Sequence, residues 1–174
     1  MKERVERMVA KLKKQSYVAA WNVLALTRIL VGFVFFWAFL DKTFGLGFAT
    51  QSGHAWINGS SPTTGFLKGV EGPFSDFFTS LAGNAFIDGL FMFGLFGLGV
   101  ALILGIGVRI AAVAGTLLLA MLWAASLPLA TNPLIDDHVI NASILWLVAL
   151  APRRFSLANI WTSLAFVKKR RWLW

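Results

Sequence analysis

The sequence contains no cysteine among its 174 residues. This absence excludes disulfide bonds, thiol redox chemistry and iron–sulfur clusters held by cysteine. Charged residues are also scarce, at 14% against 57% hydrophobic, and the mean hydropathy is +0.71. A soluble domain could not cover itself in water with so little polar surface. The chain is therefore predicted to be an integral membrane protein, and its length suits a single domain.

Basic residues are concentrated near the two ends of the chain. The sequence holds 16 Lys and Arg against 8 Asp and Glu, for a formal net charge of +8, and dense basic runs occupy residues 2–14 and 168–171. Lys and Arg beside apolar segments mark the cytoplasmic side of a membrane. We therefore predict that both termini are cytoplasmic, that the number of spans is even, and that the lipid bilayer, not nucleic acid, is the partner of these charges.

Four apolar stretches, each of about 18 residues or more, are predicted to cross the membrane as helices. They are residues 18–44, 86–106, 110–127 and 133–151. Asn132 and Pro133 suit the N-cap and first position of the fourth helix. The predicted fold class is an all-α integral membrane protein with a four-transmembrane-helix bundle over residues 18–152.

Three segments lie outside the predicted spans. Residues 1–17 read as a basic amphipathic segment on the cytoplasmic side, and residues 153–174 as an interfacial, basic C-terminal segment. The long outer loop, residues 45–85, is predicted to contain short amphipathic interfacial helices between Phe66 and Leu81.

Small residues recur every four positions on the second and third spans. Such stripes let two membrane helices approach closely, so these spans are predicted to pack against each other along them. The stripes are Gly97, Ala101 and Gly105 on one span and Ala112, Thr116, Ala120 and Ala124 on the other.

The first span carries three charged residues. Arg28 is placed roughly 10 Å inside the apolar boundary, where an unpaired guanidinium is costly. It either reaches back to the cytoplasmic head groups or faces the bundle interior with a partner. Asp41 and Lys42 mark the outer interface, and Lys42 lies within about 40° of Arg28 on the helix whereas Asp41 does not.

The start of the fourth span combines Asp136, Asp137 and His138. The helix dipole accounts for one acid in the first turn. A second acid and a histidine are predicted to form a functional mouth, because adjacent helical residues point about 100° apart and at least one should face the bundle. Asp137 shares a face with Asn141, and Asp136 with Ser143, which suggests a polar seam running inward.

His54 and Trp56 lie in the outer loop, on the same predicted side as His138. The spacing of these histidines and carboxylates is not that of a metal site, and the sequence has no second histidine pair for a transmembrane haem relay, so no metal or haem is predicted. A proton-handling role needs only one titratable histidine beside carboxylates.

Four features together resemble the DoxX/DoxD-like family of small bacterial and archaeal four-helix membrane proteins. They are TRILVGFVFFWAFLDKTFGLG, HAWINGSSPTTGFL, the small-residue spans and NPLIDDHVINA, and the resemblance covers about residues 20–151. It implies a membrane subunit of redox or sulfur metabolism in the plasma (inner) membrane of a prokaryote. DoxD-like members include the large subunit of a thiosulfate:quinone oxidoreductase.

The resulting hypothesis assigns proton handling, as catalytic residues, to Asp136, Asp137 and His138. Quinone is the expected cofactor, and it would enter from the lipid under the loop helices. The anionic substrate thiosulfate would be drawn to Lys42, and to Arg28 if that residue faces inward. The other substrate-binding candidates are Asp41, His54, Trp56 and Asn141. A second membrane or soluble redox subunit, or a further copy of the chain, is the expected partner. The alternative is a non-enzymatic membrane protein, either a small-solute transporter or a scaffold for a soluble partner.

Overall fold

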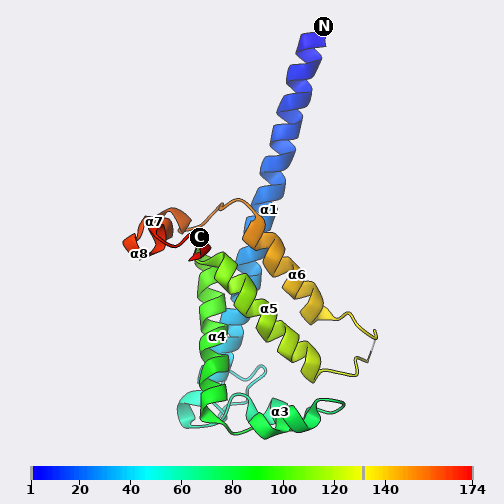
Figure 1. The fold of residues 1–174 in the computed structure, drawn as a ribbon, viewed down its shortest axis with the longest axis vertical. Coiled ribbons are helices and arrows are strands. Elements are labelled where there is room, and N and C mark those ends of the chain that lie inside the picture. The colour runs from blue at the N-terminus through cyan, green and yellow to red at the C-terminus, as the bar shows by residue number, and fades with distance from the viewer. Residues whose placement is uncertain (1, 131, 174) are drawn as a thin grey trace.

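The computed structural model describes residues 2–130 and 132–173, and across them the chain is all-helical, with no strand. Helix α1 (Lys2–Phe44) runs without a break for 43 residues. Neither Gly nor Pro occurs before Gly32, so nothing interrupts the helix between its basic N-terminal part and its apolar part. Residues 2–17, predicted as a separate amphipathic segment, therefore continue α1, and Figure 1 shows them extending well beyond the other helices.

Three further helices complete the bundle in alternating directions: α4 (Ala85–Leu104), α5 (Val108–Ala125) and α6 (Asp137–Leu150). Figure 1 shows that the N-terminal part of α1 and the C-terminal segments lie toward one end of the bundle, which we call the termini end. The short helices of the long loop cover the opposite end, which we call the loop end. Among the described residues, three helices are long and apolar enough to cross a membrane: α1, α4 and α5.

The fourth predicted span is shorter than expected. Helix α6 has 14 residues, which at about 1.5 Å per residue gives roughly 21 Å against a hydrocarbon core of about 30 Å. The predicted cap at Asn132 is wrong, because the helix begins four residues later with Asp136 as its N-cap. The Asn132 side chain instead accepts hydrogen bonds from the amides of Leu134 and Ile135 and closes a turn ahead of the helix.

The loop end and the C-terminal end are built from short elements. The long loop contains η1 (Trp56–Asn58), α2 (Thr64–Lys68) and α3 (Ser75–Leu81), so the predicted amphipathic stretch forms two helices. The C-terminal segment folds into α7 (Ala158–Ser163), α8 (Ala165–Lys168) and η2 (Arg171–Leu173).

Helices α1 and α4 pack closely through one glycine from each helix. A Cβ on Gly32 of α1 would lie 2.8 Å from the Cβ of Leu102, and a Cβ on Gly99 of α4 would lie 2.6 Å from the Cβ of Phe36. On the other side of the core, Gly115 of α5 leaves room for the Leu145 side chain of α6. The backbones approach closely because these positions carry no side chain.

Helices α4 and α5 pack against each other as predicted, but Gly97 takes no part in the contact. A Cβ on Gly97 would meet no atom within 4 Å, so this glycine faces open space rather than α5. The small-residue pattern correctly indicated that a glycine of α4 makes a close helix contact. That glycine is Gly99, two residues from Gly97, and its partner is α1.

We predict that Gly99→Ala destabilises the protein and that Gly97→Ala does not. The new methyl at position 99 would collide with Phe36, and overpacking of this kind costs about 1–3 kcal/mol. The control at position 97 adds the same methyl to open space in the same helix, where Ala is favoured over Gly by up to about 1 kcal/mol. Thermal unfolding of the purified protein in detergent measures both. Equal losses would contradict the assigned α1–α4 contact.

Candidate functional site

A cavity of 590 Å³ lies near the loop end, between α4, α5 and the two loop helices. Its volume falls within the range of about 300–1,000 Å³ typical of small-molecule sites. The walls are almost wholly apolar and include aromatic rings from α2, α3 and α4, namely Phe66, Phe78 and Phe91. Leu90 and Leu117, which also line it, are 61% and 64% exposed. The cavity therefore opens sideways onto the surface that would face lipid.

Lys42 is the only titratable group among the described residues that line this cavity. Its ammonium lies 5.9 Å from the centroid of the Phe91 ring, within the range of a cation–π contact. Thr63 in the loop is a second polar residue of the wall, and its hydroxyl donates a hydrogen bond to Asp88. One end of an otherwise apolar cavity thus presents a positive charge.

The loop wall of the cavity is attached to α4 by a buried carboxylate. Asp88 is 6% exposed, and its Oδ1 accepts hydrogen bonds from the hydroxyls of Thr63 and Ser61, the latter at 2.8 Å. Ser61 also accepts from the backbone amide of Thr64 at 3.0 Å, at the start of α2. These bonds hold α2 over the mouth of the cavity.

Asp41 points away from the cavity into the loop that follows α1. It is 2% exposed, and its Oδ1 accepts a hydrogen bond from the amide of Phe48 at 3.2 Å. Its Oδ2 has no hydrogen-bond partner among the described residues. The adjacent residues Asp41 and Lys42 therefore do different things: the acid folds the loop back, and the lysine lines the cavity.

Arg28 faces the bundle interior, which settles the two alternatives for this residue. It is 4% exposed and donates three hydrogen bonds to backbone carbonyls: Nε to Leu102 at 2.9 Å, Nη1 to Arg154 at 3.2 Å and Nη2 to Phe155 at 2.7 Å. We call this arrangement the Arg28 clasp. It joins α1 to the C-terminal end of α4 and to the segment that follows α6.

The clasp also explains a glycine at the end of α4. Gly105 ends that helix at φ 67°, and a Cβ there would lie 2.7 Å from Nη1 of Arg28 and 2.4 Å from the Cβ of Ser156. On the other side of the clasp, Phe155 adopts φ 47°, which is uncommon for a residue other than glycine. The backbone conformations of both segments are those that bring carbonyl groups to the guanidinium.

Arg28 and Lys42 are too far apart to hold one small anion together. They are 14 positions apart on a continuous helix, which at about 1.5 Å per residue is roughly 21 Å. Arg28 lies at the termini end beside Leu102, and Lys42 lies at the loop end beside Phe91.

The predicted mouth on α6 has a defined local structure. Asp136 caps the helix by accepting from the amides of His138 and Val139, and its Oδ2 lies 2.7 Å from Nδ1 of His138. Asp136 and His138 are half-buried, and Asp137 is exposed.

The polar groups beyond the mouth are bonded within α6. The Asn141 side chain donates to the carbonyl of Asp137 at 2.8 Å, and the Ser143 hydroxyl donates to the carbonyl of Val139 at 3.1 Å. Ser143 is also exposed. The expected inward polar seam is therefore wrong, because these groups satisfy the backbone of their own helix.

The predicted loop residues have separate environments. His54 is exposed, and the Trp56 ring stands edge-on to Phe93 of α4 with centroids 6.5 Å apart. Neither residue lines the 590 Å³ cavity, nor do Asp136, Asp137 or His138. Among the described residues no group of three or more His, Asp or Glu could hold a metal ion.

No family model matches the sequence, and neither a curated protein nor a solved structure matches it. The resemblance to the DoxX/DoxD-like family therefore stays a prediction. The cavity itself is a feature that the sequence pattern located only in outline, because its walls come from helices far apart in the chain.

We predict that Arg28→Lys loosens the segment that follows α6. Lysine keeps the positive charge but cannot donate to three carbonyls in the geometry of the planar guanidinium, so at least one buried carbonyl loses its donor at a cost of about 1–3 kcal/mol. Trypsin should then cleave more rapidly after Arg153 or Arg154, with the site identified by mass spectrometry.

The matched control for this experiment is Arg7→Lys, which makes the same exchange on the exposed part of α1. It should leave cleavage after Arg153 and Arg154 unchanged. Unchanged cleavage in Arg28→Lys as well would mean that the clasp does not hold the segment in place.

Proposed function

We propose that this chain is a redox-associated membrane protein that binds a quinone in the 590 Å³ cavity. The observation that carries the proposal is the combination of apolar and aromatic walls with a single cation, Lys42, at the loop end. Nearly all of a quinone's surface is apolar, apart from the carbonyl oxygens on its ring. The opening beside Leu90 and Leu117 supplies a route from the lipid.

The position of Lys42 supports a specific orientation of the bound molecule. An ammonium donates hydrogen bonds and cannot accept them, so it suits a carbonyl oxygen or an anionic head group. The isoprenoid tail would then lie along α4 and α5, against residues such as Leu98 and Leu118. The loop helices, held by Asp88, would cover the ring.

The DoxD-like resemblance supplies the enzymatic form of the proposal. Two thiosulfate ions would give up two electrons as they join to form tetrathionate, and quinone would take these up with two protons. The Asp136–His138 pair would serve as a proton donor and acceptor for this exchange, because an imidazole nitrogen and a carboxylate oxygen 2.7 Å apart can share a proton. As the pair does not line the cavity, it would act through water rather than by touching the ring.

The membrane setting follows the same proposal. Both termini would face the cytoplasm of a prokaryote and the loop helices would lie on the outer side, in keeping with the basic residues at the termini end. Helix α6 would complete the bundle as the fourth transmembrane helix. A second redox subunit would carry the electrons from thiosulfate, because the sequence holds no cysteine for an iron–sulfur cluster, and a further copy of the chain would be a partner in assembly only.

We predict that a short-chain ubiquinone raises the unfolding temperature of the purified protein and that Ala114→Trp abolishes this effect. Ala114 lines the cavity, so an indole there occupies the space of the ring. The control is Ala120→Trp, which adds the same indole to an exposed position of α5 outside the cavity.

Lys42→Met should weaken quinone binding about tenfold, equivalent to about 1.4 kcal/mol. Lys68→Met, on the exposed end of α2, should not.

A second measurement separates binding from catalysis. If the enzymatic form holds, thiosulfate should reduce the quinone in the presence of the full assembly, and His138→Ala should stop turnover while quinone binding persists. Binding without turnover would leave a quinone-binding protein of another role. No stabilisation by any quinone, or equal stabilisation of Ala114→Trp, would reject the cavity as the site.

The exposed part of α1 favours a second candidate function, a scaffold for a soluble partner. Residues 2–20 are all exposed and extend away from the bundle with mixed basic and apolar side chains. A scaffold should retain its partner when Asp136 and His138 are replaced and lose it when residues 2–14 are deleted. Solute flux in liposomes without an electron acceptor would instead indicate a transporter.

A further inference from the structure

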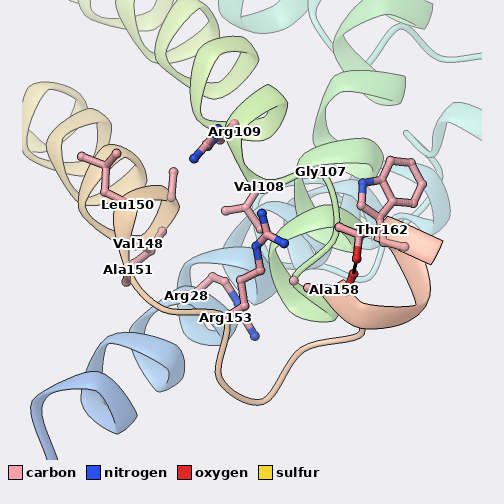
Figure 2. A pocket seen from close by; sticks show the side chains of 13 residues that line it. Arg28, Gly107, Val108, Arg109, Val148, Leu150, Ala151, Arg153, Ala158 and Thr162 are labelled. Carbon is pink, nitrogen blue, oxygen red and sulfur yellow. Dashed lines mark hydrogen bonds between the residues drawn. The ribbon is translucent and has the colours of Figure 1, made fainter. Parts of the chain in front are cut away.

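A second, smaller cleft at the termini end is rich in positive charge. It has a volume of 90 Å³ and lies between α5, the end of α6, the segment that follows α6, and α7. Three arginines line it, namely Arg28, Arg109 and Arg153, and no Asp or Glu is among its described lining residues. Figure 2 shows that they reach the cleft from three different parts of the chain.

The buried member of this cluster has no counter-ion. Arg28 is 4% exposed, and its partners are three backbone carbonyls. Among the described residues no carboxylate pairs with it. The carbonyl dipoles satisfy three of the five guanidinium N–H groups but leave the net charge in place, and a buried charge without an opposite charge is costly. An anion in the adjoining cleft would supply the missing charge.

The size and chemistry of the cleft restrict which anion fits. A volume of 90 Å³ is well above the roughly 10–15 Å³ that one water requires, yet too small for a large ligand. Guanidinium groups match the tetrahedral oxyanion of a phosphate with paired hydrogen bonds. The Thr162 hydroxyl, which also lines the cleft, donates to the carbonyl of Ala158 and keeps its oxygen as a weak acceptor for a protonated phosphate.

The surroundings of the cleft extend this match toward lipid. Leu150 and Phe155 are 75% and 67% exposed. Leu150 lines the cleft at the end of α6, and Phe155 lies two residues after the cleft residue Arg153. Apolar side chains beside a basic cleft at the end of a membrane bundle provide contacts for acyl chains next to a site for their head group.

We propose that this cleft binds a phosphate group, carried by a membrane lipid head group or present as free phosphate. The phosphate balances the charge of Arg28 and is held by Arg109 and Arg153 from the two sides of the cleft. The site is separate from the quinone cavity, and it stands whether or not quinone binds there.

Native mass spectrometry of the full chain in neutral detergent tests the proposal. The protein is titrated with phosphatidic acid, with phosphatidylcholine for comparison, and in a separate arm its unfolding temperature is followed in inorganic phosphate. We expect saturable binding of phosphatidic acid that weakens about tenfold or more in the double variant Arg109→Gln, Arg153→Gln.

The matched control removes the same two charges elsewhere. Lys11→Gln with Lys13→Gln alters exposed positions of α1 outside the cleft. Binding in this control should match that of the parent protein. The variant Ala151→Trp retains every arginine and fills the cleft, so it should also lose the ligand even if the double arginine variant fails to fold.

The outcomes separate the sources of the phosphate. Selective binding of phosphatidic acid that depends on the cleft arginines identifies a lipid head group. Stabilisation by inorganic phosphate, lost in Ala151→Trp, identifies free phosphate. The proposal is overturned if phosphatidic acid and phosphatidylcholine bind alike and phosphate has no effect, or if both double variants lose binding equally.

Discussion

The guanidinium of Arg28 is a charge inside an apolar bundle, and the termini end of the fold is arranged to bring hydrogen-bond acceptors to it. Three carbonyls meet it, one at the end of α4 and two in the segment that follows α6. Reaching them requires a left-handed glycine at Gly105 and the positive φ of Phe155. Two neighbouring bonds attach the same segment, from the Leu157 amide to the Leu104 carbonyl and from Arg154 to Asn22.

The other end of the bundle is organised by two buried acids rather than by a cation. Asp88 collects hydroxyls from the loop, and Asp41 turns the chain after α1. Each uses a short polar side chain to attach a long surface segment to a membrane helix, where unsatisfied backbone groups would be costly. The consequence is an apolar cavity with fixed walls, because α2 cannot leave the mouth without breaking the bonds to Asp88.

Composition predicted the all-helical fold class well, because lipid imposes long apolar helices. Local capping was less predictable: Asn132 and Asp136 both suit an N-cap, and only the competition between them, set by where α6 packs on α5, places the start of the helix. Packing registers were missed for a similar reason. Gly97 belongs to the four-residue stripe and Gly99 does not, yet the direction in which α1 approaches makes Gly99 the glycine in contact.

In the candidate sites too, features that are local in sequence were predicted better than those made by distant segments. A cluster adjacent in sequence, such as Asp136 with His138, was found because its geometry is local. The cavity was located only in outline, since its walls join α1, α4, α5 and the loop helices, and the arginine cleft was not found, since its walls join α1, α5, α6 and the C-terminal segment. Arg28, Arg109 and Arg153 lie in separate parts of the sequence and line one cleft once the chain is folded. The clasp accounts for two of these arginines, because it fixes Arg28 to the segment that carries Arg153, whereas Arg109 reaches the same cleft from the start of α5.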